Sequence, residues 1–337
     1  MTDGTESSPT TIFDIADAAG VSITTVSHVF SGNRPVGRAT RRKVLEAAER
    51  LRYHPRGSAR ALATGRSMTL ALQISSSGPE LLFNPFFTSL LPAMSEAAIE
   101  LGYSFVFVPG DDAARSFVEP LIARRTIDGA ILVDPLPDDG FVTEVIAQRV
   151  PYVTLGRVLG GPEAPSVDHD HASLVRMVIS HLRENGYTRI DLITTPQEIS
   201  YVADIVAAFG EEVPGGSVVE ASGLSVDAGY EAALELLTGE DRPDAIFCVN
   251  DVPAVGVLQA AETVGLRVPD ELGVVGVEDS SLAQHAKPPL TTVRAHPEEA
   301  GRLLIATIDA VLAGNADPPP HAIVPSELVV RRSSSRA

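Results

Sequence analysis

The chain has 337 residues, of which 44% are hydrophobic, 21% charged and 5% aromatic. This length and composition favour a folded protein of two or three domains and exclude a mostly disordered chain. Taken over the whole chain, the net charge of −18 argues against nucleic-acid binding. No stretch approaches the ~18 apolar residues of a membrane span, and the N-terminus lacks a signal-peptide pattern, so a cytoplasmic protein is expected.

The charge is distributed unevenly along the chain. Residues 10–66 hold ten lysines or arginines and four acids, a net charge of +6. Residues 67–337 hold 16 basic and 38 acidic residues, a net charge of −22. This division suits a small module that binds a polyanion and an acidic body that the same polyanion repels. Charge alone leaves open the alternative of a solvated basic helix.

Three short helices are predicted within residues 10–54. The apolar positions of the first follow helical spacing: Ile12, Ile15, Ala16 and Ala19. Gly20 ends this helix in a tight turn, and Ser22 is placed to cap the second. One face of the second helix is apolar, with Val26, Val29 and Phe30. The third is predicted over Arg38–Tyr53, with Val44, Ala48 and Leu51 directed inward.

The opposite face of the second helix is short and polar, and consists of Ile23, Thr24, Ser27 and His28. In a helix-turn-helix, the second helix enters the major groove of DNA and its N-terminal residues reach base edges. Ile23 can contact a thymine methyl group, Thr24 offers a hydroxyl, and His28 offers a ring nitrogen to a base or a phosphate. The alternative is a solvent-exposed helix in another helical module.

After residue 67, apolar runs alternate with amphipathic segments. The predicted strands are Thr69–Ile74, Ser104–Val108, Gly129–Val133, Tyr152–Leu155, Ile190–Ile193, Ala245–Cys248 and Gly273–Val277. The predicted helices are Leu90–Leu101, Phe141–Arg149, Ser173–Asn185, Ala228–Leu237, Ala254–Val264 and Glu298–Leu312. This alternation predicts parallel sheets covered on both faces, and its length suggests two lobes. The single cysteine, Cys248, excludes an internal disulfide framework and a thiolate metal cluster.

Several motifs resemble those of one family of bacterial transcription regulators. The run from Thr11 to Gly65 contains DIADAAGVSITTVSHVFSG, TRRKVLEAAERLRYHP and ARALATG. It resembles the DNA-binding domain of the lactose-repressor/galactose-repressor (LacI/GalR) family. The resemblance continues through NPFF, IDGAILV, AIFCVND, RVPDELGVVGVED and PPLTTVR. It implies an α/β fold, with a small all-helical helix-turn-helix head and a two-lobed, periplasmic-binding-protein-like body with parallel sheets.

The resemblance also implies a domain organisation. Residues 1–9 are expected to form a disordered N-terminus, 10–54 the helix-turn-helix domain and 55–66 a hinge helix or linker. Residues 67–330 are expected to bind an effector and to dimerise, with the chain crossing between lobes near residues 167, 294 and 324. Residues 331–337 are expected to be a polar tail. No leucine heptads follow Val330, so the family pattern implies a homodimer.

On the same basis, nine residues are expected to contact DNA: Thr11, Ser22, Ile23, Thr24, Ser27, His28, Tyr53, Arg56 and Leu62. Leu62 matches a leucine that wedges into the minor groove when the hinge helix forms on DNA, and such a wedge bends the duplex. The alternative for this segment is an ordinary flexible linker. His28 and Arg56 depart from the residues common in the family, which points to a different operator sequence.

Five residues match positions in the cleft between the lobes and are expected to bind the effector: Phe86, Arg157, Asn250, Asp251 and Glu278. Phe86 can stack on a ring, Arg157 can donate a forked hydrogen bond, and the others follow strand ends, where open α/β sheets bind ligands. The alternatives are a core role for Phe86, helix capping for Asn250 and Asp251, and a surface ion pair for Glu278. Ala203 stands where many relatives have an arginine that grips the effector.

The predicted function is a sequence-specific DNA-binding regulator, a repressor whose operator affinity is controlled by a small metabolite in the cleft. A sugar or sugar derivative is the favoured effector and a nucleoside the next. The expected partners are operator DNA, the effector and a second copy of the chain, with no membrane and no cofactor. A corepressor-dependent or effector-independent regulator stays open. An enzyme is disfavoured, since GxGxxG, GxxxxGK[ST] and GxSxG are absent. A sugar-binding transport protein is disfavoured, since a secreted binder needs a signal peptide and has no use for a basic helical head.

One cluster has the composition of a metal site: Asp168, His169, Asp170 and His171. Residues 169 and 171 can share a strand face. Asp168 instead matches a structural aspartate of the family at the lobe crossover, and no further ligand from a helix is evident. No metal is therefore expected.

Overall fold

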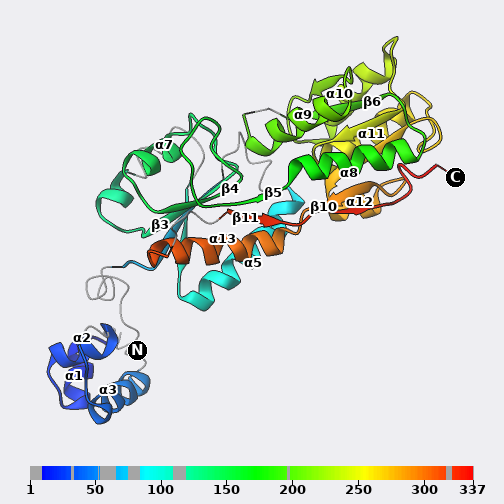
Figure 1. Cartoon of the computed structure of the whole chain (residues 1–337). Coiled ribbons are helices and arrows are strands. Elements are labelled where there is room, and N and C mark those ends of the chain that lie inside the picture. The colour runs from blue at the N-terminus through cyan, green and yellow to red at the C-terminus, as the bar shows by residue number, and fades with distance from the viewer. Residues whose placement is uncertain are drawn as a thin grey trace, which may run out of the picture. The chain divides into compact units, whose positions relative to one another are not determined.

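The computed structural model describes residues 10–31, 34–51, 53, 66–74, 84–108, 119–195, 198–315 and 321–336 (Figure 1). The described residues form two compact units. One, called the head below, extends to Thr69 and includes Ala123–Asp128, and the other, the body, contains the rest. The predicted disordered segment 1–9 and residues 55–65 of the predicted hinge, with Arg56 and Leu62, lie outside the described residues. Within the described part, no helix is long and apolar enough to cross a membrane.

The head contains α1 (Ile12–Ala19), α2 (Ile23–Ser31) and α3 (Arg38–Arg50). Gly20 ends α1 with a φ of 65°, a left-handed conformation that favours glycine. The backbone N–H of Val21 donates to the Ala16 carbonyl at 3.0 Å, which closes the turn. The Ser22 hydroxyl accepts from the Thr25 backbone N–H at 3.1 Å, so the predicted cap of α2 is confirmed.

The three helices enclose a small apolar core. Its buried side chains include Ile15, Val26, Val29, Val44, Ala48 and Tyr53. The third helix is shorter than predicted and ends at Arg50, because the Tyr53 backbone N–H donates to the Ala48 carbonyl at 2.9 Å and turns the chain. The Tyr53 ring then packs 5.8 Å from the Phe30 ring, centroid to centroid. Tyr53 is therefore a core residue of the head.

The body contains two six-stranded sheets. The first has the order β11 (His321–Val324), β5 (Ser166–His169), β4 (Tyr152–Leu155), β3 (Gly129–Val133), β1 (Thr69–Ile74), β2 (Ser104–Val108). The second has the order β12 (Glu327–Val329), β10 (Thr291–Arg294), β9 (Gly273–Glu278), β8 (Ala245–Cys248), β6 (Ile190–Thr194), β7 (Val218–Glu220). The central strands pair in parallel, and β12 is antiparallel to β10.

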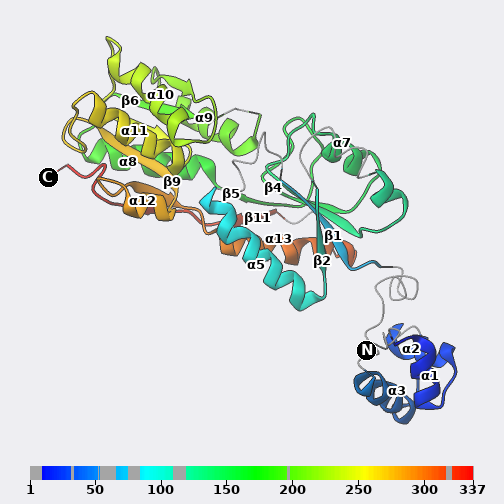
Figure 2. The same cartoon turned by 180° about the vertical axis from the view of Figure 1, so that it is seen from behind.

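Helices cover both faces of each sheet (Figures 1 and 2). At the first sheet, α5 (Pro85–Leu101) packs on α13 (Pro297–Leu312) on one face, and α7 (Gly140–Ala147) lies on the other. At the second sheet, α8 (His171–Glu184) and α9 (Ser200–Glu212) share a core with Leu192 and Phe247. The opposite face packs on α10 (Val226–Thr238), α11 (Asp251–Thr263) and α12 (Ser281–His285). Alternate side chains of the buried strands thus enter two different cores.

The chain crosses between the two lobes three times: after β5, after β10, and between β11 and β12. The segment after β12 belongs to the second lobe. Ser333 and Ser334 are fully buried. The Ser333 hydroxyl donates to the Val274 carbonyl at 2.6 Å and accepts from the Thr291 backbone N–H at 2.8 Å. The polar composition of this tail therefore reflects buried hydrogen bonds within the lobe.

The helices α10 and α11 pack closely against each other at Gly256. A Cβ atom at Gly256 would lie 2.1 Å from the Val226 carbonyl oxygen and 2.5 Å from the Tyr230 backbone nitrogen. At Gly210 in α9, nothing lies within 4 Å of such a Cβ. Gly256→Ala should therefore lower the free energy of unfolding in urea by about 1–3 kcal/mol. Gly210→Ala, the control, should leave it unchanged or raise it by ~0.5–1 kcal/mol. Equal effects of the two substitutions would contradict this account of the packing.

Candidate functional site

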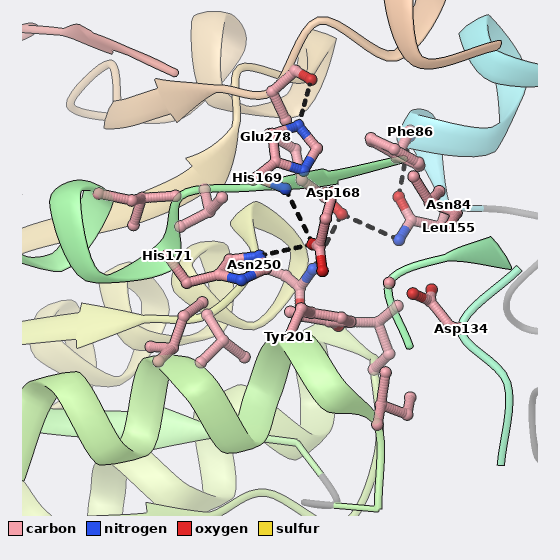
Figure 3. Close-up of a pocket in the computed structure, with 18 of the residues that line it drawn as sticks. Asn84, Phe86, Asp134, Leu155, Asp168, His169, His171, Tyr201, Asn250 and Glu278 are labelled. Carbon is pink, nitrogen blue, oxygen red and sulfur yellow. Dashed lines mark hydrogen bonds and ion pairs between the residues drawn. The ribbon is translucent and has the colours of Figure 1, made fainter. Parts of the chain in front are cut away.

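A cavity lies between the two lobes of the body, where the carboxyl ends of their central strands face each other (Figure 3). Both lobes contribute to its walls. The polar side chains that line it are Asn84, Asp134, Asp168, His169, His171, Tyr201, Asn250 and Glu278. The apolar walls include Phe86, Leu155, Ile205 and Val277. This combination of apolar walls with a few convergent polar groups is characteristic of small-molecule sites.

Glu278 ends β9 and is only 8% exposed. Its Oε1 accepts hydrogen bonds from Asn84 Nδ2 at 3.0 Å and from Asn250 Nδ2 at 2.8 Å (Figure 3). Its Oε2 is buried without a partner. Burial, together with the nearby Asp251 carboxyl, raises the pKa of Glu278 to about 8. Asn84 belongs to the first lobe and Asn250 to the second, so Glu278 links the two lobes at the cavity.

The two amides are positioned by the starts of helices. Asn84 caps α5, because its Oδ1 accepts from the Phe86 backbone N–H at 2.9 Å, and its Nδ2 stays directed at Glu278. Asn250 precedes α11 but makes no capping hydrogen bond with its side chain. Its Oδ1 accepts from the Tyr201 hydroxyl at 3.3 Å instead. The capping alternative for Asn250 is therefore wrong, and its side chain belongs to the cavity.

Asp251 is fully buried but is not part of the cavity lining. Its two oxygens accept from the Ser280 backbone N–H at 2.8 Å and from the Thr292 hydroxyl at 2.5 Å. Burial raises the pKa of Asp251 to about 6. These contacts hold the loop that follows β9, directly after Glu278.

Arg157 also lies outside the lining, and its guanidinium group binds another part of the protein. Its two terminal nitrogens donate a fork to the Asp204 carboxylate, one of them at 2.6 Å. Burial alone would raise the pKa of Asp204, but the hydrogen bonds from Arg157 hold that pKa well below its usual range. The Arg157 backbone N–H donates to the Ser200 hydroxyl at 3.0 Å. The forked donor expected for an effector thus joins the first lobe to α9.

Asp134 follows β3 and directs its carboxyl group into the cavity (Figure 3). Burial, with a further contribution from Asp168, raises the pKa of Asp134 to about 7. Across the cavity, His169 Nε2 lies 2.8 Å from the Ala295 carbonyl oxygen and must donate to it. His171 lies between two carboxylates, 3.8 Å from Asp168 and 3.7 Å from Asp204.

The metal-like cluster is only partly assembled. Asp168, His169 and His171 each have a ligand atom within 4.8 Å of the others. Asp170 caps α8 by accepting from the Ser173 backbone N–H at 2.9 Å. Nε2 of His169 donates a hydrogen bond to the Ala295 carbonyl oxygen, so only Nδ1 of that ring is left to bind an ion.

Of the five predicted effector residues, the structure brings Phe86, Asn250 and Glu278 together and leaves Arg157 and Asp251 outside the lining. Six polar residues of the lining were not expected to bind the effector: Asn84, Asp134, Asp168, His169, His171 and Tyr201. Asp134 could have been found, because it directly follows a predicted strand. Tyr201 could not, because α9 was not predicted; Tyr201 and Ile205 of that helix face the cavity, and Ala203 does not.

In the head, the predicted DNA-facing side of α2 is accessible. Ile23 is 41% exposed, Thr24 is exposed, and Ser27 and His28 are partly exposed. Thr11 and Ser22 flank this side at the starts of α1 and α2, and both are accessible. Val26 and Val29, on the other side, are buried. An exposed isoleucine at the N-terminus of this helix suits an apolar contact with a partner.

The buried carboxyl of Glu278 generates a prediction on stability. Its pKa is raised from 4.5 to about 8, so between these values the unfolded chain releases the proton that the folded chain retains. The wild type should lose stability as pH rises from 5 to 8.5. Glu278→Gln, which keeps an acceptor for both amides, should lose less, by on the order of 2 kcal/mol. Urea unfolding across this pH range measures the difference, and Glu262→Gln, exposed on α11, is the control. Parallel pH curves for wild type and Glu278→Gln would contradict the assignment.

Two family models match the chain. Residues 11–56 match "Bacterial regulatory proteins, lacI family", and residues 179–334 match "Periplasmic binding protein-like domain". The transcriptional regulator CelR of Thermobifida fusca is 32% identical over 332 residues, which are 95% of this chain and 96% of that protein.

Solved structures show the same similarity along almost the whole chain. The complex of the transcriptional regulator CelR with cellobiose superposes with a TM-score of 0.74 at 30% identity, covering 96% of this chain and 99% of that one. The lac repressor dimer bound to operator and the anti-inducer ONPF gives 0.82 at 27% identity, covering 98% and 100%. On these grounds, the chain belongs to the lacI family of bacterial regulatory proteins.

Proposed function

We propose that this chain is a transcriptional repressor whose affinity for operator DNA is set by a small polar metabolite bound between the lobes of the body. The cavity carries this proposal, because polar side chains from both lobes converge in it. A ligand that touches both lobes has different contacts when the lobes move, so it can shift the equilibrium between their arrangements. The relative CelR was solved with cellobiose, which favours a sugar or sugar derivative here.

The head contacts DNA through the exposed side of α2. Ile23 reaches a thymine methyl group, Thr24 and Ser27 reach bases or phosphates, and His28 reads a base edge or a phosphate. Ser22 donates to a phosphate from the start of α2, where backbone N–H groups add to the attraction. Thr11 lies beside the DNA at the start of α1, with its backbone N–H and its hydroxyl both donating to Asp14. The net charge of +6 over residues 10–66 supports this placement, since phosphate contacts supply most of the affinity.

The operator is bound by two copies of the chain. Each chain has one head, and a single helix in the major groove covers a short half-site, so a dimer would read a roughly palindromic sequence. The lac repressor structure, a dimer bound to operator, supports the same arrangement. The hinge residues Arg56 and Leu62 complete the proposed DNA contacts.

Within the cavity, Glu278 and the amides of Asn84 and Asn250 are the proposed centre of recognition, with Phe86 stacking on a ring of the ligand. Arg157 acts indirectly: its fork to Asp204 holds α9, and so Tyr201, against the cavity. Asp251 acts through the loop that follows β9. Induction is favoured over corepression, and the sign of the ligand's effect on operator affinity decides between them.

DNA binding can be tested by selecting operator fragments from genomic DNA. The selected sites should show two-fold symmetry, and the affinity should fall by roughly 10³ to 10⁵ between 50 and 200 mM salt, as for ~6–10 phosphate contacts. His28→Ala should relax base preference at one position of each half-site, by about 1–3 kcal/mol if the ring contacts a base edge. Salt-insensitive binding would rule out the proposed interface. An unchanged operator with His28→Ala would assign that ring to a phosphate.

Effector control can be tested by screening neutral, basic and acidic metabolites by thermal shift and titrating operator in the presence of each hit. A true effector should change operator affinity by about 5- to 150-fold. Asn250→Ala should weaken its binding at least tenfold, because a ligand group and Glu278 both lose a hydrogen-bond partner. Glu262→Gln should behave as wild type. Unchanged ligand affinity in Asn250→Ala would show that the effector binds elsewhere.

A further inference from the structure

The cavity is strongly acidic. Three carboxyl groups line it: Asp134 and Asp168 from the first lobe and Glu278 from the second. Among the described residues, no lysine or arginine is part of the lining. The guanidinium group of Arg157, which was expected to face the ligand, donates from both terminal nitrogens to Asp204.

Two of these carboxyl groups, those of Glu278 and Asp134, have no lysine or arginine partner within the described structure. Asp168 has His171 at 3.8 Å, but the partners of Glu278 are two neutral amides, and both donate to Oε1. Oε2 of Glu278 is buried and accepts nothing. In Figure 3, Asp134 has no dashed line to any of the drawn residues. Once ionised, each of these two groups therefore offers at least one free acceptor oxygen to the cavity.

Buried carboxylates are normally paired with a cation or coordinated by a metal, because burial without a partner is costly. Here the described residues provide the buried Oε2 of Glu278 and the partly exposed Asp134 carboxyl group on facing lobes, with no lysine or arginine for either. A ligand with a phosphate or carboxylate would meet three carboxyl groups and no lysine or arginine. A ligand with an ammonium group would supply the missing charge, with three donors for the acceptors that are left.

We propose that this cavity takes a hydroxylated ligand with a protonated amino group, of which an amino sugar is the simplest example, and that it rejects phosphorylated and carboxylated metabolites. The inference deepens the proposed function and rests on the cavity being the effector site. The ammonium group lies between Oε2 of Glu278 and the Asp134 carboxylate. The hydroxyl groups bind Asn250 and Asp168, and the ring lies against Phe86.

A divalent metal is the competing source of positive charge. It would use Asp168, His169 and His171, whose ligand atoms lie within 4.8 Å of one another. His169 already donates from Nε2 to the Ala295 carbonyl, and His171 already lies beside Asp168 and Asp204. A metal there would leave Glu278 Oε2 without a partner. The distribution of free acceptors thus favours an organic ammonium ion over a metal.

The raised pKa values of Glu278 and Asp134 provide an independent signature. The ionisable groups around Glu278 are Asp134 across the cavity, Tyr201 on α9 and Asp251 behind it on α11. A cation stabilises the ionised carboxyl groups, so its binding should release protons near neutral pH. The affinity for an amine should therefore rise from pH 5 to pH 7, a range in which the amine itself stays protonated, and that for a neutral sugar should not rise.

The test uses matched probes on the full chain: cellobiose against the glucosamine disaccharide of the same linkage, and D-glucose against D-glucosamine and D-glucose 6-phosphate. Calorimetric titration at pH 5 and pH 7 should show the amine of at least one set binding tenfold or more tighter than its hydroxyl counterpart. That amine should release protons, and glucose 6-phosphate should not bind. Glu278→Gln should remove most of the preference for the amine, and Glu262→Gln should not.

The inference is overturned if no amine binds more tightly than its counterpart, or if the phosphate binds as well as the sugar. It is also overturned if zinc chloride alone stabilises the wild type and Glu278→Gln equally and more than any amine does. If cellobiose binds in preference to its amine and changes operator affinity, the inference fails while the proposed regulator stands. If an amine binds as expected but operator affinity does not change, the site chemistry stands and effector control fails.

Discussion

The buried carboxyl group of Glu278 is the centre on which the arrangement of the body depends. It accepts one amide hydrogen bond from each lobe, through Asn84 and Asn250. Asn84 is held by its capping hydrogen bond to α5, and Asn250 by the Tyr201 hydroxyl. Asp251 in turn holds the loop after β9, and Arg157 fastens the first lobe to α9 at the other side of the cavity. Any ligand that competes for Glu278 therefore acts on a contact that joins the lobes.

The head and the body differ in size and in the sign of their charge. The head is small and basic, and its core is closed by Tyr53 packing on Phe30 at the end of α3. The body is large and acidic, and the carboxyl groups of Asp134, Asp168 and Glu278 line its cavity. The acidic body is repelled by the phosphates that attract the head, which favours docking with the head toward DNA.

The regular elements of the body could be predicted because their side chains alternate between two apolar cores. The seven predicted strands all exist, with bounds within one residue of those observed. The strands β5, β7, β10, β11 and β12 were missed because they are short and carry polar residues such as Asp168, Thr292 and Glu327. In α9, small and polar residues such as Ser200 and Asp204 obscure the helical pattern, and Tyr201 was missed with it.

The site was predicted less completely than the fold, because sequence indicates which residues stand at strand ends but not which oxygen or nitrogen is free. Asn250 and Asp251 are adjacent, yet one faces the cavity and the other anchors a loop. Arg157 has the chemistry expected of a side chain that binds an effector. Only the position of Asp204 shows that the donors of Arg157 are used within the protein.

The central claim is that ligand binding in the cavity and operator binding by the head are thermodynamically linked. The most direct measurement is a reciprocal titration, with operator affinity determined with and without a saturating cavity ligand, and ligand affinity determined with and without saturating operator. The account predicts that both affinities change by the same factor, and in the same direction. A ligand that binds the cavity while operator affinity stays constant would contradict it.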